Sequence, residues 1–224
     1  MQQQAENLII TRITQPNVPP LIQVTEAGII GKIGFNAAGV GTCLNAIKVL
    51  GIDAAKIPVH LGLRMALESR SVQEAVRRLR GCGMASSAHI LVADPGSALG
   101  LEFTRSTFAE CAPVGARVVH GNHLVGAHPG EVDMVWLRDS LVRVVSMREN
   151  SDALEKRGGE VGWRDVEGLF EDERGLPYAI CRMADGSPWG STTLFNIVME
   201  LGARRAVGRV GRPVEGGERI ELRL

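Results

Sequence analysis

The first quarter of the chain alternates short apolar runs with turn residues, a pattern typical of antiparallel strands. Residues 8–13 and 21–25 are strand-sized apolar runs, and the prolines between them interrupt any continuous ladder, so the two runs predict a β-hairpin. Two more strands are predicted at 29–35 and 39–45, with a turn at 36–39. Glycines recur inside these strands, which indicates turns or the close passage of another backbone.

The spacing of apolar residues then changes to that of a helix. Residues 57–68 carry apolar side chains at helical spacing, and Pro58 suits a first helical turn. Ser71 followed three residues later by Glu74 is a capping box, which predicts a second helix that ends near Gly81. Two helices therefore follow the first group of strands.

Strands return in the rest of the chain, with two helical stretches among them. We predict strands at 87–93, 100–104, 117–120, 179–183, 192–199, 206–210 and 219–222, and helices at 136–147 and 161–173. This order contains no repeated βαβ unit, so the sheets should be mostly antiparallel and covered by helices. The predicted fold class is α+β, with layers in the order helix, sheet, sheet, helix.

Composition narrows the classes of protein and partner. The 224 residues suffice for one domain with a full core, and no linker-like stretch divides them, so we expect a single domain over 1–224. Basic and acidic residues balance at 25 each without a basic run, which indicates neither a nucleic acid nor an anionic membrane as partner. No apolar run approaches the roughly 20 residues that a membrane-spanning helix needs.

The cysteines and histidines favour neither a metal nor a cofactor. Four cysteines are scattered without a C-x-x-C pair, which favours small buried hydrophobes over zinc ligands or a redox pair. They are Cys43, Cys82, Cys111 and Cys181. His120, His123 and His128 cluster in the sequence. A zinc site also needs a fourth donor at defined spacing, and Glu131 and Asp133 are only loosely placed for that role, so we expect no metal.

The sequence HGNH at 120–123 is a candidate site because it follows a strand-like run. Gly121 would let a substrate carbonyl approach, and the side-chain amide of Asn122 could donate a hydrogen bond to an oxyanion. Asn after Gly is more often a turn residue, however, so the residues alone favour a turn and leave the catalytic interpretation open.

A series of short motifs, HGNH among them, favours the catalytic interpretation of this stretch. The motifs are TEAGIIGK at 25–32, GFN at 34–36, GV at 39–40, LRMALES at 63–69, GMASSA at 83–88, GLEF at 100–103, HGNH at 120–123, ICR at 180–182, TLFNI at 193–197 and GRP at 211–213. Their content and order resemble the acyl-coenzyme A:6-aminopenicillanic acid acyltransferase family, which acts in fungal penicillin synthesis. The resemblance runs from about residue 7 to the end of the chain.

The resemblance implies a fold and a chemistry. The fold would be the αββα sandwich of the N-terminal nucleophile hydrolases, in which glycines let antiparallel strands pass closely beneath the active site. In such enzymes a precursor cuts itself before a cysteine, whose thiol then attacks an acyl-CoA, a β-lactam side chain or another amide. The acyl group passes to an amine or to water. Asn122 would be the oxyanion donor, and Thr104 stands where the family has a serine linked to self-cleavage.

The sequence departs from the family in two places. The nucleophilic cysteine and an acidic residue lie upstream of the segment that resembles residues 7–9, and neither is present here, so we expect a fold that is incomplete at its N-terminus. The family also uses an arginine where this chain has Trp189 and Gly190. An internal thiol has no α-amine to serve as its base, so none of the four cysteines replaces the nucleophile.

These departures leave two functional hypotheses. The first is an acyltransferase or amide hydrolase that is inactive as given and is completed by a separate N-terminal segment or subunit. The second is a non-catalytic paralogue that binds an acyl-CoA or a peptide-like ligand. The changes at Trp189 and Gly190 favour the second, whereas the glycines and Asn122 favour the first. The C-terminal Leu-Arg-Leu is a weak form of the peroxisomal S-K-L signal, so the location, cytoplasmic or peroxisomal, stays open.

Overall fold

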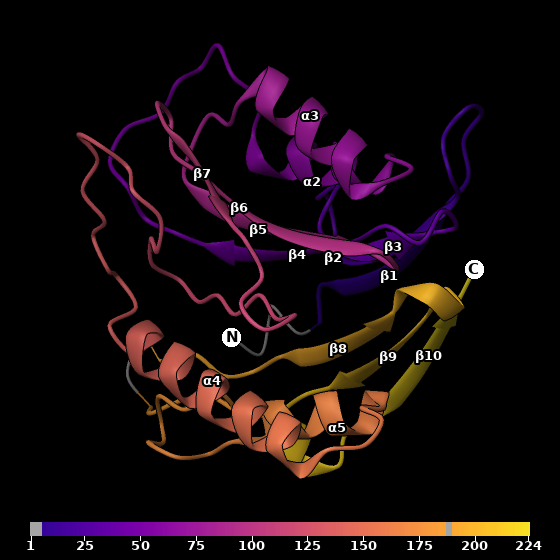
Figure 1. Cartoon of the computed structure of the whole chain (residues 1–224), viewed down its shortest axis with the longest axis vertical. Coiled ribbons are helices and arrows are strands. Elements are labelled where there is room, and N and C mark those ends of the chain that lie inside the picture. The colour runs from indigo at the N-terminus through magenta and orange to yellow at the C-terminus, as the bar shows by residue number, and fades with distance from the viewer. Residues whose placement is uncertain (1–5, 187–189) are drawn as a thin grey trace.

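Two β-sheets face each other in the computed structural model, and each is covered by helices on its outer face (Figure 1). The structure describes residues 6–186 and 190–224. The predicted layering of helix, sheet, sheet and helix is therefore confirmed. Within these ranges, no helix has both the length and the apolar character to cross a membrane.

The first sheet has seven strands in the order of the sequence, and every neighbouring pair is antiparallel. Its strands are β1 (Leu8–Ile13), β2 (Leu21–Glu26), β3 (Ile33–Asn36), β4 (Gly41–Ala46), β5 (Ala88–Asp94), β6 (Ser97–Phe103) and β7 (Phe108–Cys111). Helices α2 (Val59–Leu67) and α3 (Val72–Cys82) connect β4 to β5 and lie on the outer face. As predicted, Ser71 caps α3, because its hydroxyl accepts a hydrogen bond from the Glu74 amide.

The second sheet has three antiparallel strands in the order β10-β9-β8. They are β8 (Phe195–Glu200), β9 (Arg205–Val210) and β10 (Arg219–Arg223). Helices α4 (Ser140–Arg157) and α5 (Trp163–Gly168) cover its outer face, as Figure 1 shows. Short 3₁₀ turns follow α5 at Leu169–Glu171, β8 at Leu201–Ala203 and β9 at Pro213–Glu215.

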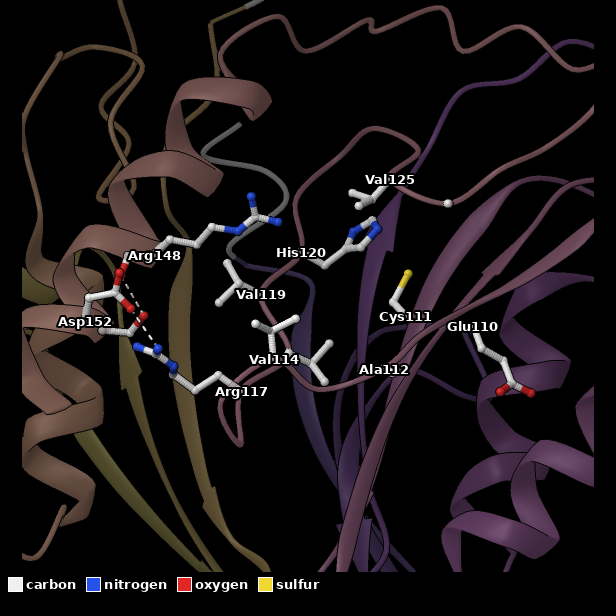
Figure 2. A pocket seen from close by; sticks show the side chains of 13 residues that line it. Glu110, Cys111, Ala112, Val114, Arg117, Val119, His120, Val125, Arg148 and Asp152 are labelled. Atoms are coloured by element: carbon white, nitrogen blue, oxygen red, sulfur yellow. Dashed lines mark hydrogen bonds and ion pairs between the residues drawn. The ribbon is translucent and has the colours of Figure 1, made fainter.

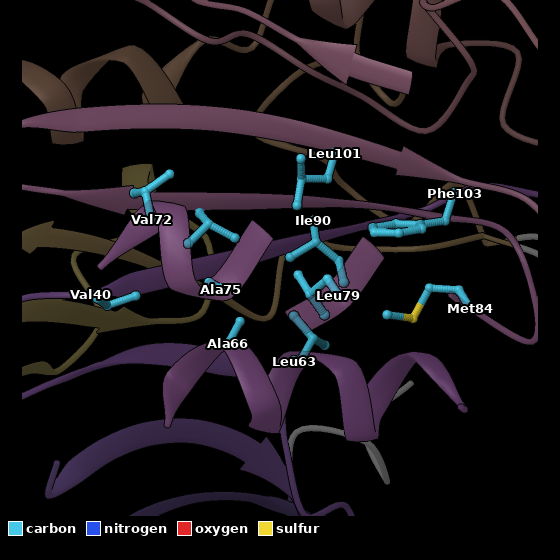
Figure 3. Close-up of a cluster of buried hydrophobic side chains, with 11 residues drawn as sticks. Val40, Leu63, Ala66, Val72, Ala75, Leu79, Met84, Ile90, Leu101 and Phe103 are labelled. Atoms are coloured by element: carbon cyan, nitrogen blue, oxygen red, sulfur yellow. The ribbon is translucent and has the colours of Figure 1, made fainter. Parts of the chain in front are cut away.

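Two apolar clusters hold the layers together. The larger one fills the space between the seven-stranded sheet and its helices, where Leu63 and Leu79 of α2 and α3 contact Ile90 and Leu101 of the sheet (Figure 3). The smaller one joins the two sheets through Phe35 and its neighbours, packed against residues of β8, β9 and β10. Burial of these side chains provides most of the favourable free energy of folding.

The glycines of the first strands permit close contacts between backbones. A Cβ atom at Gly34 would lie 2.1 Å from the carbonyl oxygen of Ile22 on β2. A Cβ atom at Gly31 would lie 2.3 Å from the carbonyl oxygen of His60 in α2. Glycine is therefore required where β3 lies against β2 and where the loop before β3 contacts α2.

Three predicted elements differ from the structure. The strand predicted at 117–120 is wrong, because Gly115 and Ala116 form a turn with positive φ values and the backbone of Arg117 forms an isolated bridge with Val114, outside the strands of the described residues. The strand that follows β6 is β7, which we did not predict. The strand predicted at 179–183 is also wrong, since Cys181 bonds through its amide to the carbonyl of Asp172. The helix predicted at 136–147 begins at 140 and extends to 157.

Candidate active site

A largely apolar cavity of about 910 Å³ lies between the two sheets. Cys43 and His89 line it from the seven-stranded sheet, and Phe195 and Asn196 line it from β8. Met147 and other residues of α4 and α5 close its outer side. The cavity can therefore take an apolar group that reaches polar atoms only at a few points.

A second cavity of about 540 Å³ lies between β7 and α4 (Figure 2). Arg148 and Asp152 of α4 line one side, and Glu110 and Cys111 of β7 line the other. The segment from 117 to 120 lines both cavities and separates them. Arg117 in this segment forms ion pairs with Asp152 at 2.7 Å and with Glu155 at 3.0 Å, which attach the segment to α4.

A buried carboxylate fixes the loop that carries the candidate motif. Glu102 of β6 is fully buried, and its Oε1 accepts hydrogen bonds from His120 Nε2 at 2.6 Å and from the Val125 amide at 2.6 Å. Its Oε2 accepts from the Gly126 amide at 2.7 Å and faces His128 Nε2 at 3.1 Å. Burial alone would raise the pKa of Glu102, but these hydrogen bonds outweigh it and hold the pKa at about 2. The carboxylate is therefore ionised at neutral pH.

His120 also stacks on a second histidine. The rings of His89 and His120 are 3.6 Å apart and nearly parallel. His89 Nδ1 lies 2.9 Å from the Asn45 side-chain oxygen, whereas its Nε2 has no hydrogen-bond partner in the described part of the chain. Burial, reinforced by the charge of His120, lowers the pKa of His89 to about 3, so His89 is neutral at physiological pH.

Two partly buried cysteines that line the cavities are poor nucleophiles. Burial raises the pKa of the Cys43 thiol to about 11. Burial and the neighbouring Glu102 raise the pKa of Cys111 to about 12. Since the thiolate is the attacking species, neither thiol is activated at neutral pH.

The histidines and carboxylates that we considered as metal ligands do not converge on one point. His123 contacts Ser140, Asp133 accepts a hydrogen bond from the Leu124 amide, and Glu131 accepts from Thr104. Over residues 6–186 and 190–224, one trio of ligand atoms lies within 4.8 Å of one another, on Glu102, Cys111 and His120. Both oxygens of that carboxylate already accept hydrogen bonds, so the trio is a self-contained network.

Asn122 is held at both its backbone and its side chain. Its amide nitrogen donates to Ser140 Oγ at 2.5 Å. Its side-chain Nδ2 donates to the carbonyl of Ala46 at 3.0 Å, and its Oδ1 accepts from Arg143 Nη2 at 2.9 Å. Asn122 itself lines neither cavity, although His120 lines both. The second hydrogen of Nδ2 has no acceptor among the described residues.

Thr104 lies in a different environment. It is buried at the end of β6, where its hydroxyl bonds to Thr107 Oγ1 at 2.7 Å and to Glu131 at 3.2 Å. It lines a third cavity of about 310 Å³, near the end of α3, and no cavity described here contains both Thr104 and Asn122. The role of Thr104 in self-cleavage stays a prediction. Trp189 lies outside the described residues.

Sequence reasoning missed three residues that shape the site. Glu102 could have been found as a charged residue between apolar neighbours in a strand, but Arg143 gave no signal of its own. Asn196 lies on β8, which pairs only with β9 within the described residues, and it is 7% exposed. Neither its Oδ1 nor its Nδ2 has a described partner, so both are buried polar atoms without a hydrogen bond in a residue that lines the larger cavity.

Comparison with known proteins assigns the family. The sequence matches the family described as Acyl-coenzyme A:6-aminopenicillanic acid acyl-transferase over residues 3–215. The chain belongs to this family. It is 40% identical over 212 residues to the 40 kDa form of acyl-coenzyme A:6-aminopenicillanic-acid-acyltransferase from Emericella nidulans. The match covers 93% of the chain and 58% of that relative's length.

Solved structures agree on the fold of this acyltransferase-family chain. A conjugated bile acid hydrolase variant from Clostridium perfringens superposes with a TM-score of 0.67 at 12% identity, over 97% of this chain and 84% of the hydrolase. Penicillin V acylase from Agrobacterium tumefaciens gives 0.60 at 11% identity, over 92% and 70%. The predicted αββα sandwich fold is therefore confirmed.

Proposed function

We propose that this chain supplies the substrate cavity and the oxyanion donor of an acyltransferase or amide hydrolase. Its substrates would be an acyl-CoA, a β-lactam such as penicillin, or another small amide. The observation that carries the proposal is the Asn122 amide, which is fixed by tertiary contacts and keeps one N–H uncommitted within the described structure. It lies two residues after His120, which lines the apolar cavity between the sheets.

The chemistry requires such a donor. Attack on a thioester or an amide carbonyl places negative charge on the carbonyl oxygen, and a fixed N–H lowers the energy of that state. Removal of one donor of this kind commonly slows a reaction by roughly 10²–10³-fold. The cavity would hold the apolar part of the acyl group, since its walls are mostly apolar.

The nucleophile would come from a separate N-terminal segment. The high pKa values of Cys43 and Cys111 argue against either of these two thiols as the nucleophile. Two features of the second sheet support an added strand: the edge of β8 that has no partner among the described residues, and the Asn196 amide beside it with both atoms unpaired. Backbone groups of an extended segment would pair with both.

The test is reconstitution. The chain is produced with a segment equivalent to the part of the Emericella nidulans relative that precedes the matched region, and acyl transfer from phenylacetyl-CoA to 6-aminopenicillanic acid is measured. We expect no turnover by the chain alone and turnover in the complex. Asn122→Ala should lower kcat by roughly 10²–10³-fold with a smaller change in KM. Asn150→Ala, which alters an amide of α4 bonded to Asp172, is the matched control.

Two outcomes would refute the proposal. Turnover by the chain alone that is abolished by alkylation of its own cysteines would place the nucleophile inside it. An equal loss of stability and activity in Asn122→Ala would assign this residue to the turn alone.

A non-catalytic paralogue is the second candidate, because Trp189 and Gly190 replace the family's arginine. In that case the reconstituted complex would bind phenylacetyl-CoA in a calorimetric titration and would not turn it over.

A further inference from the structure

The first turn of α4 holds the Asn122 side chain. Arg143 donates from Nη2 to Asn122 Oδ1 at 2.9 Å and from Nε to Asp139 Oδ2 at 2.7 Å. The other oxygen of Asp139 accepts from Arg182 Nη2 at 3.0 Å. All three charged side chains are largely buried, with exposed fractions between 10% and 18%.

These contacts determine which way the amide of Asn122 points. A guanidinium group can only donate, so the atom that faces Arg143 must be the amide oxygen. A carbonyl can only accept, so the atom that faces Ala46 must be the amide nitrogen. A flipped amide would place donor against donor at Arg143 and acceptor against acceptor at Ala46. One orientation is therefore strongly preferred, and it directs the second N–H away from both partners.

Asp139 keeps Arg143 in place for this role. An unrestrained arginine side chain loses up to about 2 kcal/mol of rotamer entropy when it is ordered, and a neutral amide oxygen alone offsets little of that cost. The carboxylate of Asp139 lies four residues earlier, just before α4. It forms a charge-assisted hydrogen bond that holds the guanidinium of Arg143 in place independently of Asn122. Arg182 occupies the remaining oxygen of Asp139 and limits its rotation.

Helix α4 also fixes the backbone of the turn that contains Gly121 and Asn122. Ser140, the first residue of α4, accepts the hydrogen bond from the Asn122 amide nitrogen. A Cβ atom at Gly121 would lie 2.5 Å from the same Ser140 oxygen, so the turn lies directly on the helix. The backbone and the Oδ1 atom of Asn122 thus take their positions from α4, whereas its Nδ2 is held by Ala46 of β4.

We infer that Arg143 and Asp139 are positioning residues, which act through Asn122 to keep one amide N–H aimed at the developing oxyanion. The catalytic meaning of this inference rests on the proposed function. The orientation of the amide does not, and it can be measured on the chain itself.

The experiment follows the side-chain amide of Asn122 by NMR in a sample labelled with ¹⁵N-asparagine. The signal is identified by its absence in Asn122→Ala. In the wild type, the hydrogen bonded to Ala46 should exchange with solvent more slowly than the free one. Arg143→Met keeps the apolar stem and removes both donors, so exchange of the protected hydrogen should rise by about tenfold, the equivalent of one hydrogen bond.

Further variants distinguish a specific effect on the position of the Asn122 amide from a general loss of structure. Arg143→Lys should fail to restore protection, because a single ammonium cannot reproduce the two directed bonds of the guanidinium. Asp139→Asn should shift exchange in the same direction by a smaller factor. Arg157→Met removes an arginine from the far end of α4 that pairs with Asp165, and it should leave the Asn122 signal unchanged. Far-UV circular dichroism verifies that each variant is folded.

The outcomes distinguish this inference from the proposed function. Unchanged exchange in folded Arg143→Met, or full rescue by lysine, would overturn the positioning role whatever the activity. The expected exchange pattern with no turnover in the reconstituted complex would uphold the positioning role and reject the proposed function. With turnover, Arg143→Met should lower kcat and leave KM nearly unchanged; a rise in KM alone would also overturn the inference.

Discussion

Replacement of Glu102 by glutamine tests whether the buried carboxylate organises the loop around the candidate site. Glu102 accepts hydrogen bonds from the amides of Val125 and Gly126 and contacts His120 and His128. Glutamine has nearly the same shape, but one of its two terminal atoms is a donor. At least one buried backbone N–H must then face another N–H.

The size of the effect follows from these contacts. A hydrogen bond to a charged group contributes about 1.5–3 kcal/mol, and a buried donor left without an acceptor costs about 1–3 kcal/mol. The histidines can relieve part of this loss by a change of tautomer, whereas the backbone amides cannot. We therefore expect Glu102→Gln to lower the free energy of unfolding by about 3 kcal/mol. The pKa of Glu102, held at about 2 against an ordinary value of 4.5, corresponds to a similar free energy, about 3 kcal/mol.

The assay is urea unfolding at pH 7, followed by far-UV circular dichroism. The midpoint should fall with an unchanged slope, since the same surface is exposed on unfolding. Glu110→Gln is the control, because Glu110 is an exposed residue of the neighbouring strand β7 whose ion pair with Arg80 is solvent-accessible. Its effect should stay below about 1 kcal/mol. The reasoning is refuted if Glu102→Gln costs no more than Glu110→Gln.

Three further predictions rest on other measurements. Because the pKa of Glu102 is depressed in the folded state, its stabilising contribution is complete above pH 4.5 and is lost as the pH falls towards 2. Urea midpoints of the wild type should therefore fall more steeply than those of Glu102→Gln between pH 5 and 2, and parallel curves would contradict this. Alkylation by iodoacetamide at pH 8, followed by mass spectrometry, should modify exposed Cys82 at least about tenfold faster than Cys43 and Cys111, whose pKa values are raised to about 11 and 12. The reverse order would show that the thiol of Cys43 or Cys111 is activated. Gly34→Ala should cost more than about 3 kcal/mol in urea unfolding, since its Cβ would overlap the backbone of β2, whereas Gly168→Ala, which has open space around it at the end of α5, should cost nothing. Equal effects of the two substitutions would disprove the close-contact argument.

Local signals in the sequence predicted much of the fold. The hairpin of β1 and β2, the turn after β3 and the capped start of α3 depend on residues within a few positions of one another. The false strand at 117–120 shows the limit of such signals. Its residues are apolar enough for a strand, but Glu102 draws the loop that follows into the interior, and Glu102 lies 18 residues before His120.

Asn122 could be identified as a candidate site residue from the sequence, but the residues that surround it could not. The motif around Asn122 could be found from the sequence, because it forms part of a family pattern. Its partners Ala46 and Arg143 lie 76 and 21 residues away, so no local pattern could reveal them. The pairing of Arg143 with Asp139 resembles an ordinary helical ion pair until the structure brings Asn122 against it.

Two of the attachments of α4 differ in their exposure to solvent, and they should therefore respond differently to salt. At its start, the largely buried bonds among Asp139, Arg143 and Asn122 are shielded from salt. Towards its end, the ion pairs of Arg117 with Asp152 and Glu155 are half exposed and weaken as ionic strength rises. Rising ionic strength should therefore loosen the contact of Arg117 with α4, in the wall shared by the two cavities, before it loosens the contact of Arg143 with Asn122.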